Sequence, residues 1–116
     1  MTTARKLPEL TEADNITTIK GFMESRHWYA IRIQSGVVRG KTGDTYIRMG
    51  KKGEGRPDWI FLRAREFVLV EMKRPGKGLS KDQQAFFDRA EILGMPCIWA
   101  DSFSMFLSKY GRMFTR

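Results

Sequence analysis

The chain has 116 residues and a formal net charge of +8. This length suits one domain, which can bury roughly two thirds of the surface that its unfolded chain exposes. Cys97 is the only cysteine, so an internal disulfide is excluded, and no stretch resembles a signal peptide or a membrane-spanning helix. We therefore expect an intracellular, cytoplasmic protein with no membrane association. The excess of basic residues favours a nucleic-acid partner over solubility alone.

The N-terminal residues 1–10 are expected to form a flexible arm, because Pro8 interrupts any periodic pattern. Residues 11–116 are expected to form a single domain without repeats or linkers. A first helix should begin after Thr11, which is a favourable N-cap residue with an acid three residues later, as in a weak capping box. The helical pattern runs to about Arg26.

One face of this first helix carries both apolar residues and an acid. At about 100° per residue, Ile16, Ile19 and Met23 fall within a narrow wedge, and Glu12 projects into its middle. One interpretation of Glu12 is a first-turn acid that interacts favourably with the helix dipole. The other is an inward-facing carboxylate that serves a functional site. The helix alone supports both interpretations equally.

The next segment combines strand patterns with many basic residues. Residues 29–34 alternate as a half-buried strand does, and residues 45–49 are a candidate short strand. Glycines interleave with lysines and arginines from Val37 to Arg56, so that the backbone can approach a phosphate chain closely. The alternative, an ordinary solvated hairpin, is less favoured because acids follow directly. The residues expected to bind nucleic acid include one before this segment and two after it, and they are Arg32, Arg39, Lys41, Arg48, Lys51, Lys52, Arg56, Arg74 and Lys77.

A hairpin follows, formed by apolar runs at residues 59–62 and 67–70 with a polar break between them. A turn centred on residues 64–65 places Asp58 opposite Glu71. Directly opposed side chains share one face of a sheet, with Cβ atoms roughly 5 Å apart, so two like charges repel there. The sequence therefore predicts a carboxylate pair at the open end of the hairpin.

Lys73 lies two residues beyond Glu71, and the period of two in a strand places both side chains on the same face. Two carboxylates and one ammonium group then converge. Such a cluster is costly unless a further cation joins it. Oxygen ligands suit a magnesium ion that keeps several waters, which a phosphate can replace.

The remainder of the chain predicts a loop, a helix, a strand and a last helix. The loop is residues 74–78, after which Ser80 caps a helix with Gln83 as its capping-box partner. Gln83 also lies over the apolar face of that helix, although a plain cap would need no further role. Residues 96–100 are expected to form a short buried strand, and Ser102 opens the last helix.

Three ordered motifs carry a resemblance to a known family. They read Gly53-x-Gly55-x-Pro57-Asp58, Glu71-x-Lys73-Arg74-Pro75-Gly76 and Leu79-Ser80-x-x-Gln83. The set closely resembles the VRR-Nuc (virus-type replication-repair nuclease) domain of the PD-(D/E)XK superfamily, and particularly its short, standalone phage-type members. The resemblance is collinear from about Thr11 to Ser102. Two departures are Gln34, where relatives have Asn, and Met72, where many have Val.

The resemblance implies an α/β fold with a restriction-endonuclease-like core, in which α-β-β-β-α-β elements form a mixed central sheet flanked by helices. Carried over residue by residue, the metal ligands would be Asp58, Glu71, the main-chain carbonyl of Met72 and Glu12, the last either directly or through water. Lys73 would orient the attacking water or stabilise the charged phosphorane. Gln83 would complete the catalytic set from the second helix. The resemblance thus favours the functional interpretation of Glu12.

The function that the resemblance implies is Mg2+-dependent cleavage of DNA by an endodeoxyribonuclease, with Mn2+ able to substitute and no organic cofactor. Phage-type relatives suggest a homodimer acting on branched DNA such as Holliday junctions. The alternatives are a nuclease that prefers flaps or single strands, and a non-catalytic basic module that only binds nucleic acid. A sequence-specific restriction-type enzyme is less favoured, because such enzymes usually carry extra recognition elements and this chain has little room for them.

Overall fold

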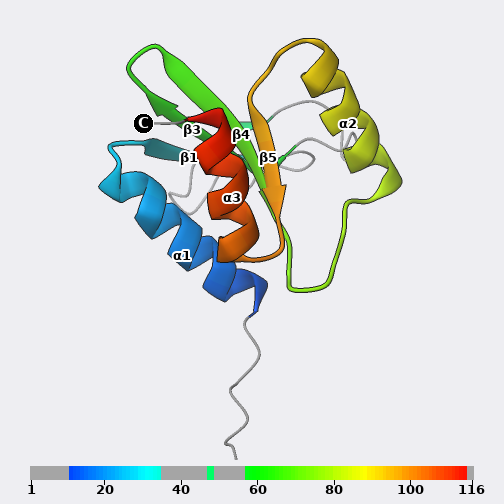
Figure 1. The fold of residues 1–116 in the computed structure, drawn as a ribbon, viewed down its shortest axis with the longest axis horizontal. Helices are drawn as coiled ribbons and strands as arrows, with labels where there is room; N and C mark the ends of the chain where they lie inside the picture. The colour runs from blue at the N-terminus through cyan, green and yellow to red at the C-terminus, as the bar shows by residue number, and fades with distance from the viewer. Residues whose placement is uncertain (1–10, 35–46, 49–56, 115–116) are drawn as a thin grey trace, which may run out of the picture.

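A computed structural model describes residues 11–34, 47–48 and 57–114 (Figure 1). The expected arm and most of the basic segment lie outside these described residues. The elements are α1 (Glu12–Ser25), β1 (Tyr29–Gln34), β2 (Ile47–Arg48), β3 (Trp59–Arg63), β4 (Glu66–Met72), α2 (Lys81–Ile92), β5 (Cys97–Ala100) and α3 (Phe103–Met113). The expected α/β order is confirmed, including the last helix, and β2 falls within the short strand expected at residues 45–49.

The strands form one mixed sheet in the order β2-β1-β3-β4-β5. The pairs β1–β3 and β3–β4 are antiparallel, whereas β1–β2 and β4–β5 are parallel. β5 begins at Cys97, one residue later than expected. Pro96 still accepts a hydrogen bond from Leu69 N at 3.0 Å, but proline has no N–H to donate in return.

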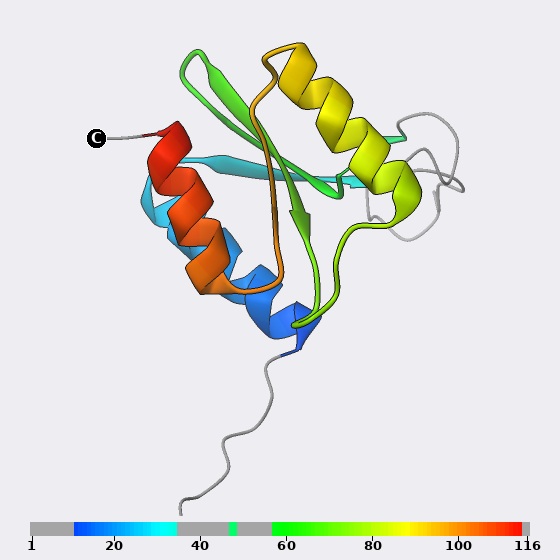
Figure 2. The ribbon, with the colours of Figure 1, turned by 45° about the vertical axis from the view of Figure 1, so that its right-hand side comes forward.

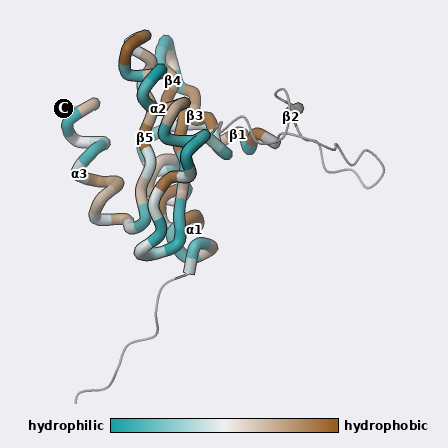
Figure 3. Tube along the Cα trace, turned by 90° about the vertical axis from the view of Figure 1, so that its right-hand side faces the viewer, coloured by the Kyte–Doolittle hydropathy of each residue, from teal (hydrophilic) through white to brown (hydrophobic). Residues whose placement is uncertain are grey.

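Helices cover both faces of the sheet. α1 and α3 lie together against one face, and α2 lies on the other face beside β5 (Figures 1 and 2). Coloured by hydropathy, the chain shows its hydrophobic stretches along β3 and β4, while α1 and α2 carry long hydrophilic stretches (Figure 3). Within the part of the chain that the structure describes, no helix has the length and apolar character needed to cross a membrane.

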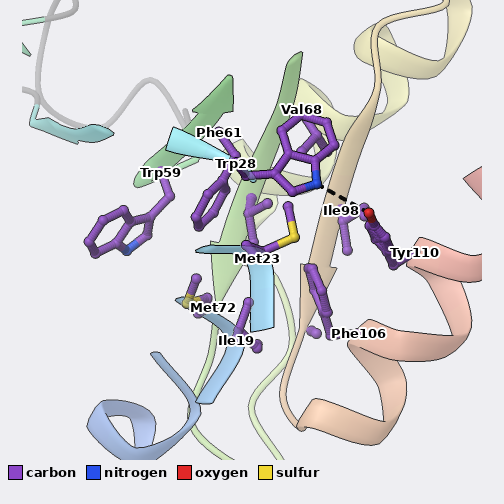
Figure 4. Close-up of a cluster of buried hydrophobic side chains, with 12 residues drawn as sticks. Ile19, Met23, Trp28, Trp59, Phe61, Val68, Met72, Ile98, Phe106 and Tyr110 are labelled. Carbon is purple, nitrogen blue, oxygen red and sulfur yellow. Dashed lines mark hydrogen bonds between the residues drawn. The ribbon is translucent and has the colours of Figure 1, made fainter. Parts of the chain in front are cut away.

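The main core lies between the sheet and the α1–α3 pair (Figure 4). Phe61 and Val68 from the sheet and Phe106 from α3 are fully buried. The core includes one hydrogen bond between side chains, from Trp28 Nε1 to the Tyr110 hydroxyl at 3.1 Å. Burial of this apolar surface is the main source of stability, at about 25 cal/mol per Å².

The helix starts are those that the sequence predicts. Thr11 and Asp14 form a complete capping box at α1, and Ser80 and Gln83 form one at α2. Ser102 caps α3 through its side chain. Each cap satisfies backbone N–H groups that have no partner inside the helix, which fixes where the helix begins.

The hairpin of β3 and β4 has the expected turn at residues 64–65. Leu62 pairs with Phe67, and Ile60 pairs with Leu69, as the sequence predicts. Because side chains alternate between the two faces of a strand, this register determines which residues enter the core and which reach the opposite face.

Candidate active site

Asp58 and Glu71 are neighbours across the end of the β3–β4 hairpin. The ladder closes with Trp59 opposite Val70, and Asp58 and Glu71 stand one step beyond that pair. The Asp58 N–H donates to Glu71 Oε1 at 3.2 Å. The carboxylate pair predicted from the hairpin register is therefore present.

Glu71 is a buried acid with one cationic neighbour. Only 3% of its surface is exposed, and its Oε2 lies 3.5 Å from Lys73 Nζ. The pKa of Glu71 is raised to about 7, mainly by burial and in addition by the nearby charge of Asp58, while Lys73 opposes both effects. Lys73 thus offsets only part of the cost of this carboxylate, which leaves the pair suited to a further cation.

Asp58 is half-buried, and burial raises its pKa as well. The charge of Arg32 opposes that rise, whereas Glu12 adds to it. Glu12 is exposed at the start of α1 but lies close enough to act on Asp58. Even so, the described residues contain no group of three acid, histidine or cysteine side chains placed to hold one metal ion. The geometry brings together two acids, with Glu12 as a more distant third.

Gln83 occupies the first turn of α2, as the sequence predicts. The side-chain Oε1 of Gln83 accepts the backbone N–H of Ser80 at 2.9 Å, and the backbone N–H of Gln83 donates to Ser80 Oγ at 3.2 Å. The amide oxygen of Gln83 is therefore engaged in the cap and not with Asp58, Glu71 or Lys73. The capping interpretation is confirmed, and the catalytic interpretation stays a prediction.

The expected nucleic-acid-binding residues are described only in part. Arg32, Arg74 and Lys77 are exposed, and Arg74 and Lys77 belong to the loop that follows Lys73. The backbone of Arg48 is part of β2. The side chain of Arg48 and the whole of the remaining five lie outside the described residues, namely Arg39, Lys41, Lys51, Lys52 and Arg56.

Sequence reasoning missed two residues near the acids, Asn15 and Asp101. Asn15 is only 1% exposed, and its Nδ2 donates to the main-chain oxygens of Lys73 at 3.3 Å and Asp101 at 2.8 Å. The signal was available, because Asn15 precedes the buried Ile19 by one helical turn and so shares its inner face. A polar amide there needs partners.

A mixed sheet with two acids and a lysine at its strand ends is an arrangement that suits a nuclease-family domain. The model of the VRR-NUC domain matches residues 37–103, which is more than half of the chain. The chain belongs to the VRR-NUC family and is a nuclease-family domain, which implies DNA as its substrate. The matched range includes Asp58, Glu71, Lys73 and Gln83 but begins after α1. Neither the curated proteins nor the solved structures gave a match.

Proposed function

We propose that the chain is a Mg2+-dependent endodeoxyribonuclease that acts on branched DNA such as Holliday junctions. The observation that carries the proposal is the acid pair of Asp58 and Glu71, buried beside Lys73 in a VRR-NUC domain. Burying two acids against each other lowers the stability of a fold. Such a pair is therefore more often found where the acids have a function. A module that only binds DNA gains nothing from acids beside phosphates.

The donor set fits magnesium. Asp58 and Glu71 supply carboxylate oxygens, and burial raises the pKa of both groups more than the nearby positive charges lower it. Together with the main-chain carbonyl of Met72, and with Glu12 through water, they would hold Mg2+, and Mn2+ would substitute. When bound, the ion polarises a phosphoryl oxygen and lowers the pKa of a water molecule.

Lys73 supplies a fixed positive charge at the reacting phosphate. Its ammonium group orients the attacking water or stabilises the negative charge that grows on the phosphoryl oxygens. Water adds to phosphorus in line with the bond to the 3′ oxygen, that bond breaks, and the products are a 3′ hydroxyl and a 5′ phosphate. Gln83 would contribute from α2 by donating its amide N–H to the phosphate.

Basic residues around the acids would hold the DNA backbone. Arg32 lies near Asp58, and the loop of Arg74 and Lys77 continues directly from Lys73. Contacts of this kind fix the register of the DNA and carry little sequence information. The rest of the proposed contact set is Arg39, Lys41, Arg48, Lys51, Lys52 and Arg56.

A homodimer suits the proposed substrate. Symmetric cuts across a two-fold junction need two active sites, which one copy of this small domain does not supply. The support for this step is the resemblance to phage-type members of the family together with that symmetry argument. Sedimentation of the protein at micromolar concentration should give a dimer mass, and a monomer would contradict this part of the proposal.

The decisive experiment compares DNA structures. Linear duplex, single-stranded, flap and four-way-junction DNA are incubated with the protein in Mg2+, in Mn2+ and in EDTA. We expect cleavage that needs metal and is fastest on the junction, and loss of cleavage in Lys73→Ala. The matched control is Lys20→Ala, because Lys20 is a half-buried α1 lysine whose partner is Glu24.

Each other outcome identifies an alternative. Faster cleavage of flaps or single strands would make that DNA, and not the junction, the preferred substrate, while the proposed hydrolysis would stand. Binding without cleavage in either metal would favour a non-catalytic nucleic-acid-binding module. Cleavage by Lys73→Ala at the wild-type rate would remove Lys73 from the mechanism.

A further inference from the structure

The ends of β4 and β5 are tied together by a side chain from α1. Lys73 and Asp101 are the residues directly after these two parallel strands. Asn15 Nδ2 donates to both of their main-chain oxygens, at 3.3 and 2.8 Å. The Lys73 N–H also donates to Ala100 O at 2.8 Å, which extends the ladder past the end of β4.

Asp101 makes a second connection to the same segment. Its Oδ2 accepts the Gly76 N–H at 3.1 Å. The chain that leaves β4 is therefore held at Lys73 by Asn15 and again at Gly76 by Asp101. Gly76 has a φ of 82°, a left-handed conformation that glycine adopts readily and that turns the loop back.

We propose that Asn15 and Asp101 are positioning residues that fix the backbone from Met72 to Gly76, so that the Met72 carbonyl and the Lys73 ammonium are aimed at the acid pair. This inference rests on the proposed nuclease function. It adds two residues from outside the acid pair to the mechanism. One of them, Asn15, lies on α1 and so outside the matched VRR-NUC range.

The chemistry of Asn15 explains why an amide stands there. One NH2 group has two hydrogens, so it can donate to two carbonyl oxygens at once. A carboxylate of the same shape would place its oxygens against those carbonyls, and an apolar residue would leave both of them without this donor. Because Asn15 is buried, water cannot easily replace the missing hydrogen bonds.

Positioning matters here because Lys73 acts at close range. Its Nζ already lies 3.5 Å from Glu71 Oε2. A displacement of about 1 Å at a reacting group can cost about 100-fold in rate. A loosened strand end would let the Lys73 side chain turn away while the sheet and the remaining DNA-binding residues, such as Arg32, stay in place.

The test compares Asn15→Leu and Asn15→Asp with Tyr110→Phe. The control also removes a buried side-chain hydrogen bond, between Tyr110 and Trp28, but on the α3 side of the core away from Lys73. For each variant, kcat and KM on the preferred DNA, the melting temperature and amide hydrogen exchange are measured. Exchange is followed at Lys73 and Gly76, with Val68 as a core reference, in metal-free protein.

We expect kcat to fall by about 10- to 100-fold in both Asn15 variants, with a smaller change in KM from the loosening of Arg74. Exchange at Lys73 and Gly76 should speed up far more than at Val68. Tyr110→Phe should lower the melting temperature but leave kcat and the Lys73 exchange rate unchanged. If Asn15 variants only lower the melting temperature, as the control does, Asn15 is structural and the inference is overturned.

Asp101 provides a second test. It is less buried than Asn15, so its substitution should disturb folding less. Asp101→Asn keeps an oxygen that can accept the Gly76 N–H, and should keep most of kcat. Asp101→Leu removes that acceptor and should lower kcat while freeing the Gly76 amide to exchange. Equal kcat in the two variants would contradict the role of Asp101. An inactive wild-type protein would instead overturn the proposed function, and the exchange rates would still show whether these residues order the strand end.

Discussion

The two faces of the central sheet are built by the same strands under different constraints. On the face toward α1 and α3, Val68 and Val70 of β4 are fully buried in an apolar core. On the opposite face, the next residue, Glu71, is 3% exposed and lies beside a second acid. Val70 and Glu71 are adjacent in β4 and both are buried, but Val70 lies among apolar side chains and Glu71 lies in a charged cluster.

This difference separates stability from function. The apolar face gains free energy for each methyl group that it removes from water. The charged face loses free energy, because Glu71 and Asp58 must give up hydration and repel each other with only Lys73 and Arg32 in opposition. Substitutions on the two faces should therefore have opposite signatures: lost stability with retained activity on one, and lost activity with retained or increased stability on the other.

The largest effect is expected for Glu71→Gln. The amide can still accept the Asp58 N–H, but it cannot serve as a charged metal ligand, so kcat/KM should fall by at least about 1,000-fold, or about 4 kcal/mol. Metal-free stability at pH 8 should increase, because the buried charge is gone. Cleavage assays and urea denaturation in EDTA measure the two effects. A variant that loses stability and activity together would show that the acid pair is structural.

Much of this arrangement was predictable from the sequence. The polar break between two apolar runs determined the hairpin register, and the register placed Asp58 opposite Glu71. Strands alternate strictly, so one correct turn assigns every side chain in the hairpin to a face. The caps at Thr11 and Ser80 were equally local, since each depends on residues only three apart.

The parts that escaped prediction depend on contacts between distant residues. Asn15 is 58 residues from Lys73 and 86 from Asp101, and its partners are main-chain atoms that a sequence motif does not reveal. The expected role of Glu12 in completing the acid pair stays a prediction, because Glu12 is exposed and its distance from Asp58 depends on how α1 packs against the strand ends. Gln83 shows the converse case, in which a local motif is confirmed while its more distant role is not tested.

On the apolar face, Phe106→Ala should lower the free energy of unfolding by about 3 to 5 kcal/mol, because Phe106 is fully buried and the neighbours cannot fill the cavity. The neighbouring Leu107 is 38% exposed, so Leu107→Ala is a matched control that should cost far less. Urea denaturation gives both values. Activity per folded molecule should be unchanged in both variants, and a selective loss of kcat in Phe106→Ala would break the separation between the faces.

The stability of the metal-free protein should depend on pH through Glu71. Its pKa is raised from 4.5 when unfolded to about 7 when folded, so the folded state holds the proton more tightly. Stability is then fully present below pH 4.5 and is lost as the pH rises through 7, by at most about 3 kcal/mol. Melting temperatures in EDTA at pH 5, 6, 7 and 8 should fall accordingly.

Magnesium and Glu71→Gln sharpen that pH profile. The ion competes with the proton for the same oxygens, so 10 mM Mg2+ should raise the melting temperature more at pH 8 than at pH 5. Glu71→Gln should flatten the profile in EDTA. A profile that keeps its slope in this variant would assign the pH dependence to other groups. It would also contradict the claim that the buried charge of Glu71 lowers the stability of the fold.

The smallest effect tests whether Gln83 belongs to the charged face at all. Gln83→Glu keeps an oxygen for the Ser80 N–H, so the capping box and the stability should be preserved. It removes the amide N–H groups, however, and places a negative charge where a phosphate would bind. If Gln83 donates to the phosphate, kcat/KM should fall by about tenfold, the value of about one hydrogen bond. Gln83→Ala, which loses both cap and donor, separates the two roles: it should lose activity, though no more than Gln83→Glu with its repelling charge, and should melt at a lower temperature. Wild-type activity in Gln83→Ala would leave Gln83 with the cap alone, and the charged face would then consist of groups on the sheet.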